Sequence, residues 1–204
     1  APPPGRGAAL YDRYHMKGHY LAFFPRCIIA LVLMLLVRNL GAQDWEQMEK
    51  DIVRLPPTAF PKLPPEVRRD LFTRGCTIPQ AYGISQPNNV ISGHLRNPKQ
   101  LDWAVLCSHE NASKVLIYFS GRAPAAELPD NPMPLDRNWL QGGGGYSRAI
   151  GIATAAEMRS NQAAYNGPAL PPLDHDGLDE AFVEKASSVS YWYQGKWLDL
   201  QGAD

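Results

Sequence analysis

Hydrophobic residues are densest between Asn89 and Gly121, where the pattern predicts three strands. The first covers about residues 89–95, the second 102–108 and the third 113–120. The second and third strands are apolar on both faces, which is typical of strands that are covered on both sides. Short polar turns separate the three strands, so this stretch predicts a buried antiparallel meander.

Before the meander, two segments have features of helices. Apolar residues recur at helical spacing over 44–55, and Pro56 stops this helix. A second helix is predicted over 65–74, with Pro65 in its first turn and Gly75 as the C-cap.

The C-terminal third of the chain predicts further strands around one helix. A strand over 148–152 leads into a helix that ends near Tyr165 and begins with Thr154 and Glu157 at capping-box spacing. A strand over 181–185 follows. A hairpin then covers 187–193 and 196–200, with its turn at Gln194-Gly195. We expect this hairpin to extend the sheet of the meander.

Together these elements predict an α+β fold. Its expected form is a mainly antiparallel sheet of about six or seven strands, with the N-terminal helices packed on it. The 204 residues, 45% of them hydrophobic, fit one domain plus a processing segment. A formal net charge of zero argues against a nucleic-acid partner, which needs a basic surface.

The N-terminal segment predicts export. Residues 1–15 are rich in Pro and Gly, and they form either a disordered leader or sequence upstream of a true start at Met16. Residues 16–42 have the pattern of a signal peptide, with an apolar run of about 11 residues over 27–37 and small residues before Gln43. An uncleaved anchor is the alternative. Cleavage leaves residues 43–204 as a single secreted or periplasmic domain with no membrane segment.

Export makes the cysteines informative. After cleavage the chain keeps Cys76 and Cys107, and two cysteines in an oxidising compartment predict a disulfide. It would connect the end of the second helix to the central strand. The alternative is a pair of buried thiols that behave as small hydrophobic groups.

The segment from Asp174 to Glu180 is the densest cluster of groups that can bind a metal. Oxygen ligands near a glycine are what a calcium loop needs, and the candidate Ca²⁺ ligands here are Asp174, Asp176, Asp179 and Glu180. The alternative is an ordinary polar turn, because Asp and Gly are common turn residues.

His175 offers an enzymatic alternative. Flanked by Asp174 and Asp176, it suits a base or zinc ligand of a metal-dependent hydrolase. The chain contains no G-x-S-x-G motif, and its spacing identifies no further zinc ligands.

Aromatic residues in the last hairpin suggest a binding surface. Tyr and Trp give large contact areas at low entropic cost, and the candidates are Tyr191, Trp192, Tyr193 and Trp197. The alternative places at least two of them in the core of the sheet.

Two resemblances accompany these patterns. Gly93-His94-Leu95 followed by Asp102-Trp103-Ala104-Val105 resembles the FG-GAP/VCBS repeat, although only Asp102 remains of its calcium-loop acids. The DWAVLC and W-L-x-L-x-GAD signatures are similar to those of uncharacterised secreted bacterial proteins. That resemblance implies export and no particular activity. We therefore expect a non-enzymatic binding or structural domain, with a protein or cell-envelope partner, and the hydrolase as alternative.

Overall fold

A computed structural model describes residues 44–129, 133–142, 144–167 and 169–204. The expected leader and signal peptide, residues 1–15 and 16–42, lie outside the described residues. Residues 44–204 form one compact unit. Among the described residues, no helix combines the length and hydrophobicity that crossing a membrane requires.

The unit begins with short elements around the predicted helices. In chain order these are α2 (Trp45–Lys50), β1 (Arg54–Leu55), a 3-10 helix (Pro57–Ala59), α3 (Pro65–Thr73) and β2 (Ile78–Pro79). The helix expected over 44–55 is wrong beyond Lys50. Arg54 and Leu55 instead pair with β2, and the proline after Leu55 favours extended backbone there. The prediction of α3 is confirmed, and Gly75 follows it with a positive φ of 67°.

The first sheet is the predicted meander. Its order is β3-β4-β5-β6 and all its pairs are antiparallel. The bounds are β3 (Val90–Gly93), β4 (Asp102–His109), β5 (Ala112–Tyr118) and β6 (Ala126–Glu127), with a 3-10 helix (Phe119–Gly121) after β5. The three strands expected between Asn89 and Gly121 are therefore confirmed.

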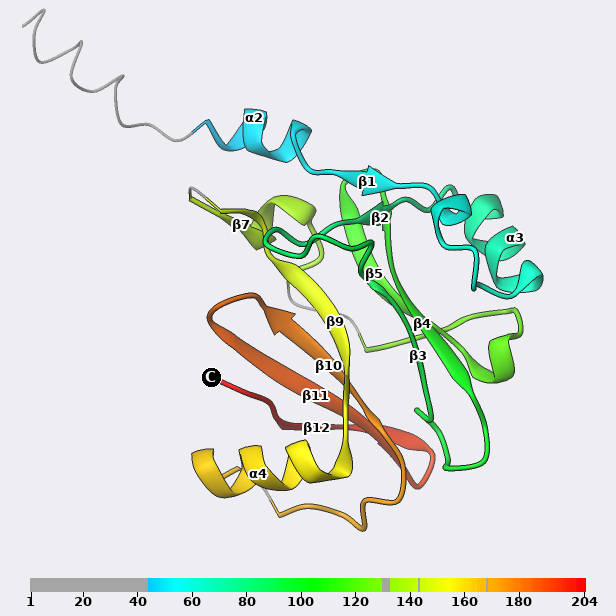
Figure 1. The fold of residues 1–204 in the computed structure, drawn as a ribbon, viewed down its shortest axis with the longest axis vertical. Coiled ribbons are helices and arrows are strands. Elements are labelled where there is room, and N and C mark those ends of the chain that lie inside the picture. Colours follow the sequence, from blue (N-terminus) through cyan, green and yellow to red (C-terminus); the bar gives the residue numbers. More distant parts are fainter. Residues whose placement is uncertain (1–43, 130–132, 143, 168) are drawn as a thin grey trace, which may run out of the picture. The chain divides into compact units, whose positions relative to one another are not determined.

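The second sheet contains the C-terminal strands in the antiparallel order β12-β11-β10-β9 (Figure 1). Its strands are β9 (Arg148–Ala153), β10 (Gly177–Phe182), β11 (Ala186–Tyr193) and β12 (Lys196–Gln201), and α4 (Ala155–Tyr165) connects β9 to β10. Before β9 lie a 3-10 helix (Asp136–Trp139) and the paired strands β7 (Leu140–Gln141) and β8 (Gly145–Tyr146).

The expected single sheet of six or seven strands is therefore wrong. The described residues form twelve strands in four antiparallel sheets: two of four strands and two of two. The predicted C-terminal hairpin exists as β11 and β12, but it pairs with β10 rather than with the meander. Alternation in sequence determines which side chains share a face; it does not determine which strands become neighbours.

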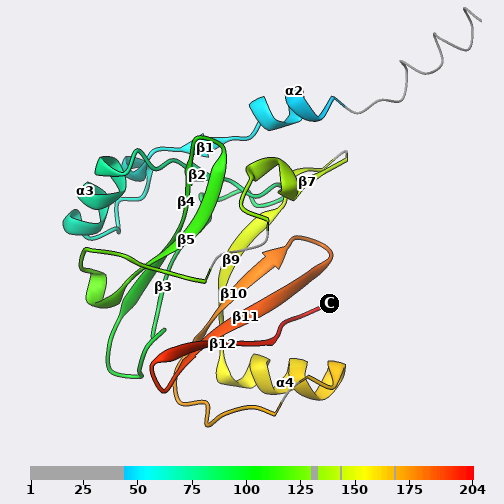
Figure 2. The same cartoon turned by 180° about the vertical axis from the view of Figure 1, so that it is seen from behind.

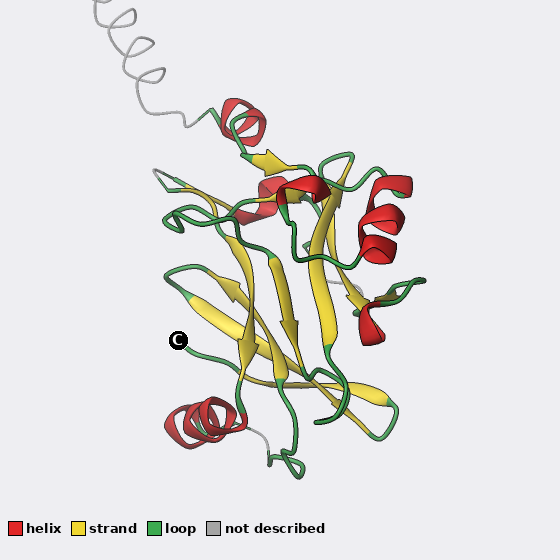
Figure 3. Ribbon diagram, turned by 45° about the vertical axis from the view of Figure 1, so that its right-hand side comes forward, coloured by secondary structure: helices red, strands yellow, loops and turns green. Residues whose placement is uncertain are grey.

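The helices take different places from those expected. Helix α2 has no buried residue, so it does not pack on a sheet as predicted. Helix α3 inserts Val67 and Leu71 against the outer face of the first sheet, while Met158 of α4 packs on the outer face of the second. The order is thus α3, first sheet, second sheet and α4 (Figures 2 and 3).

The two sheets share an apolar core between their inner faces. Alternate residues of β4 and β5 point into it, and Ile150 and Leu178 meet them from the second sheet; the members from β4 and β5 are Ala104, Leu106, Val115 and Ile117. The other residues of β4 and β5 face α3, where Cys107 forms the disulfide with Cys76. The predicted disulfide is confirmed.

Candidate functional site

The two large sheets are joined along β3 and β9. The side chain of Asn89, just before β3, donates to the carbonyl oxygen of Arg148 at 3.1 Å and accepts from the backbone N–H of Ile150 at 2.9 Å. At the other end of β3, two hydrogen bonds join His94 and Asp176. The backbone N–H of His94 donates to Oδ2 of Asp176 at 2.8 Å, and the backbone N–H of Asp176 donates to the carbonyl oxygen of His94 at 2.9 Å. This side of the sandwich is therefore closed.

A cleft lies between the other sides of the sheets, and we call it the inter-sheet cleft. Its volume is about 770 Å³, within the range of small-molecule sites. Residues of β5, β6 and the segment after it line one wall, and residues of β9 to β12 line the other. They are Ala112, Ser113, Lys114, Val115, Glu127, Leu128, Pro129, Pro134, Arg148, Glu180, Ser188, Ser190, Trp197, Leu198 and Asp199.

Polar residues of the second sheet line the cleft because of strand register. Ser190 lies opposite Leu178 on one side and opposite Asp199 on the other, so these three residues share the inner face. Leu178 is fully buried in the inter-sheet core, whereas Asp199 is exposed. The inner face thus changes from apolar to polar between β10 and β12, where it leaves the core and enters the cleft.

A buried ion pair forms the floor of the cleft. Arg148 is only 1% exposed, and its Nε and Nη2 donate to Oε1 of Glu180 at 3.0 and 2.9 Å. Its Nη1 donates to the carbonyl oxygen and Oγ of Ser113 at 2.8 and 2.9 Å. The guanidinium also lies over the ring of Trp139, 4.7 Å from its centroid. These contacts compensate for the desolvation of both charges and connect the two sheets.

Tyr146 supports the floor from below. Its hydroxyl lies 3.3 Å from Oγ of Ser113, and its ring is buried in the inter-sheet core. Burial raises the pKa of the Tyr146 phenol far above its usual range, and the charge of the buried Asp136 raises it further. The phenol therefore stays neutral and serves as a hydrogen-bonding group.

The charged residues of the cleft differ in their pairing. Lys114 Nζ lies 3.1 Å from Oε2 of Glu127, and Arg148 is paired with Glu180. The carboxylate of Asp199 has no ion pair or hydrogen bond to any described residue. Among the described residues, one negative charge in the cleft is therefore left without a partner.

Of the four aromatic residues predicted as a binding surface, Trp197 lines the cleft and Trp192 supports it. The two indole rings meet edge to face at 5.2 Å, and Phe119 packs behind Trp192 at 6.0 Å. Tyr191 is fully buried and stacks on His175, so it belongs to no exposed surface. Tyr193 is half-buried on the α4 side of the sheet. Period-two alternation places these two tyrosines on the face opposite to the tryptophans.

The four candidate calcium ligands are bound to four different partners. Asp174 Oδ1 accepts from the hydroxyl of Tyr191 at 3.2 Å, Asp176 binds His94, Asp179 binds Ser187 and Glu180 binds Arg148. Asp179 and Glu180 are consecutive residues of β10, so their side chains point to opposite faces. Among the described residues, no three His, Cys, Asp or Glu side chains are arranged to hold a metal ion.

His175, the centre of the alternative hydrolase, is largely buried and is held by backbone groups. Its Nδ1 lies 2.9 Å from the carbonyl oxygen of Asp176, and its Nε2 lies 3.0 Å from that of Trp192. With its ring stacked on Tyr191 at 4.3 Å, His175 connects the turn before β10 to β11. Because both ring nitrogens of His175 face carbonyl oxygens, neither nitrogen is directed at a substrate.

Asp102, the surviving acid of the FG-GAP-like segment, also has a structural position. It is fully buried and accepts hydrogen bonds from the backbone N–H groups of Arg96 at 3.0 Å and Ser120 at 2.8 Å. Gln100 donates to it through its side chain. The carboxylate thus holds two loops at one end of the first sheet.

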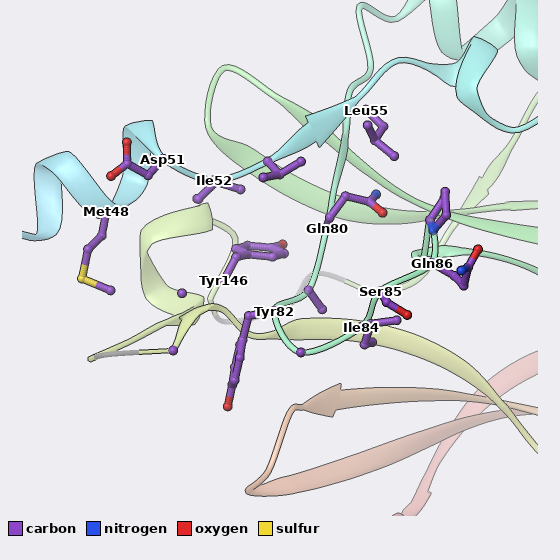
Figure 4. Close-up of a pocket in the computed structure, with 16 residues that line it drawn as sticks. Met48, Asp51, Ile52, Leu55, Gln80, Tyr82, Ile84, Ser85, Gln86 and Tyr146 are labelled. Carbon is purple, nitrogen blue, oxygen red and sulfur yellow. The ribbon is translucent and has the colours of Figure 1, made fainter.

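A second hollow, the apolar groove, lies between α2, β1, the loop after β2 and the β7–β8 hairpin (Figure 4). Its volume is about 690 Å³, and its walls include Ile52, Tyr82 and Tyr146. The hydroxyl of Tyr82 donates to Glu184 at 2.7 Å, which connects the groove to the turn after β10. The walls of the groove are mostly apolar, and their polar side chains include Asp51, Gln80 and Gln86.

Two residues of the cleft were predicted from the sequence as candidate site residues: Trp197 as part of a binding surface and Glu180 as a calcium ligand. Ser188 and Ser190 alternate with apolar residues, and that alternation was one available signal. Arg148 lies in an apolar strand, where a charged residue indicates a buried pair. Nothing in the local sequence indicates that Asp199 lines a cleft.

No protein-family model, curated protein or solved structure matches this chain. The FG-GAP/VCBS resemblance therefore stays a prediction.

Proposed function

We propose that this chain is an exported binding protein without catalytic activity, and that its ligand occupies the inter-sheet cleft. The observation that carries the proposal is the polar inner face of β11 and β12. Ser188 and Ser190 point into a cleft of about 770 Å³, and the structure gives their hydroxyls no hydrogen-bond partner among the described residues. A few unpaired polar groups beside apolar walls are typical of small-molecule sites.

The composition of the cleft favours binding over catalysis. None of its described lining residues is a histidine or a cysteine. Oγ of Ser113 contacts Arg148 and Tyr146, neither of which acts as a general base at neutral pH. Glu180 is committed to the buried ion pair with Arg148. The hydroxyl groups, the indole ring of Trp197 and the carboxylate of Asp199 remain, and they suit ligand recognition.

Two observations support export. The disulfide between Cys76 and Cys107 is of the kind that persists in oxidising compartments. The apolar run over 27–37 has the length of a signal-peptide core. Expression of the full chain in a bacterial host, followed by N-terminal sequencing of the periplasmic fraction, tests this part. We expect a mature N-terminus at Gln43; a chain that stays in the cytoplasm would contradict export.

The binding proposal is tested by a thermal-shift screen of the purified protein against small polar compounds that include cations, anions and neutral molecules. We expect a compound that raises Tm, because ligands stabilise the folded state by mass action. Ser188→Phe should abolish the shift by filling the cleft. The matched control Ser92→Phe adds the same bulk at an exposed position of β3 and should keep the shift. A complete lack of hits, or hits that survive Ser188→Phe, would overturn the proposal.

A further inference from the structure

The charges of the inter-sheet cleft indicate which ligands it would accept. Arg148 is neutralised by Glu180, and Lys114 is neutralised by Glu127. Asp199 remains as an exposed carboxylate that no described residue pairs. An anionic ligand would meet this charge with no unpaired cation among the described lining residues of the cleft, whereas a cationic group would complete the pairing.

An aromatic ring lies beside that carboxylate. Trp197 and Asp199 are two residues apart on β12, so their side chains lie on the same face with Cα atoms roughly 6.7 Å apart. Their register confirms the shared face, since Trp197 pairs with Trp192 and Asp199 with Ser190. A carboxylate next to an indole ring suits an ammonium group, which gains an ion pair from one and a cation–π contact from the other.

The surroundings hold the ring in place and supply further polar contacts. The edge-to-face contact of Trp197 with Trp192 restricts the indole. Trp192 in turn lies near Arg96, whose guanidinium is 5.9 Å from its ring. Ser190, opposite Asp199, and Ser188 provide hydroxyls for the polar part of a ligand.

We propose that the inter-sheet cleft binds a small organic cation through an ammonium group held between Asp199 and Trp197. This inference depends on the proposed binding function and names its ligand class. The shared chemistry is the ammonium group. Its sources include aliphatic diamines, amino sugars and quaternary amines, and the probes below distinguish them.

The test is isothermal titration calorimetry on the purified protein with three cations: putrescine, glucosamine and choline. Each has a neutral counterpart of similar size, namely 1,4-butanediol, N-acetylglucosamine and 3,3-dimethylbutanol. We expect at least one cation to bind about tenfold or more tightly than its counterpart, because its charge is attracted by the carboxylate of Asp199 and by the ring of Trp197. The cation that binds identifies the source.

Two variants assign the binding to the cleft. Asp199→Asn should weaken binding of the cation by about tenfold or more, since it removes the charge and keeps the shape. Glu46→Gln is the matched control, because it removes the same charge from α2, which does not line the cleft. Trp197→Leu should weaken binding of the cation more than that of the neutral counterpart, because it removes the cation–π contact.

The outcomes separate this inference from the proposed function. Equal binding of a cation and its neutral counterpart, or full affinity in Asp199→Asn, overturns the ammonium inference and leaves the cleft as a binding site. If the screen finds a compound that binds the cleft but none of the three cations binds, the ammonium inference is likewise overturned and the cleft remains a binding site. If the screen also gives no hit, both proposals are wrong.

Discussion

The side-chain Oδ1 of Asn89 accepts a hydrogen bond from the backbone N–H of Ile150 at 2.9 Å, and this bond joins the two large sheets. The amide nitrogen of Asn89 donates to the carbonyl oxygens of Pro79 at 2.7 Å and Arg148 at 3.1 Å. A single side chain therefore takes the place of strand pairing between β3 and β9. The inter-sheet cleft can exist on the other side because the sheets are fixed on this one.

We expect Asn89→Asp to lower the free energy of unfolding by about 3 kcal/mol or more. The carboxylate keeps the bond from Ile150 but faces two carbonyl oxygens, and a buried unpaired charge is strongly destabilising. Urea unfolding monitored by tryptophan fluorescence measures the change. Asn88→Asp is the control: the same substitution at a half-buried neighbour outside this junction should cost clearly less. Equal effects would contradict the role of Asn89.

We expect Glu180→Gln to destabilise the protein by about 3–5 kcal/mol, because it leaves the charge of Arg148 buried without its partner. The double variant Arg148→Met/Glu180→Leu removes both charges. It should be less destabilised than the effects of Arg148→Met and Glu180→Leu added together, which a double-mutant cycle of these three variants from urea unfolding measures. Strict additivity of the two changes would mean that the ion pair does not couple the sheets.

Reduction of the disulfide between Cys76 and Cys107 should lower stability by about 3–4 kcal/mol, as a loop closed across 31 residues predicts. The measurement is the guanidinium midpoint with and without dithiothreitol. The double variant Cys76→Ser/Cys107→Ser should have a lower midpoint that no longer responds to the reductant. If reduction leaves the wild-type midpoint unchanged, the crosslink does not contribute to stability.

Asp179 gives a pH dependence with a definite sign. Burial raises the pKa of its carboxyl. The hydrogen bond from Ser187 lowers this pKa in part, and the charge of Glu157 raises it. The folded state therefore holds this proton to higher pH than the unfolded chain does. Stability from this group is present below the unfolded pKa, near 3.9. It is lost as the pH rises from there through the folded value.

We therefore expect Asp179→Asn to reduce the fall in stability from about pH 4 upward. The change in stability caused by the substitution should be more favourable at neutral pH than in acid. Urea midpoints at a series of pH values test this. Asp199→Asn on the same sheet separates the effect of burial from that of removing one negative charge. A variant curve parallel to that of the wild type would contradict the prediction.

Calcium should not stabilise the protein through residues 174–180. The four carboxylates of the predicted loop point to different partners, and calcium needs at least six oxygen ligands around one point. Thermal melts with CaCl₂ and with EDTA should therefore have the same Tm. A Tm that rises by several degrees with calcium in the wild type, but not in Asp176→Asn, would contradict this expectation and support the calcium loop.

The sequence by itself determined the local elements that depend on near neighbours. The apolar runs of 89–121 became β3, β4 and β5, and Thr154 with Glu157 formed the capping box of α4. The disulfide was predicted because only two cysteines remain in the expected mature chain. In each case the interacting residues lie within one segment, or each residue has a single possible partner.

The tertiary structure decided how these elements pair and which side chains meet. Nothing in the alternation of β11 and β12 distinguishes an extension of the first sheet from a second sheet, because period two fixes faces and not partners. The acids of 174–180 were predicted together because they are adjacent in sequence. Alternation along β10 sends Asp179 toward α4 and Glu180 toward Arg148. The cleft arises from two sheets held along one side, a relationship between residues far apart in the chain.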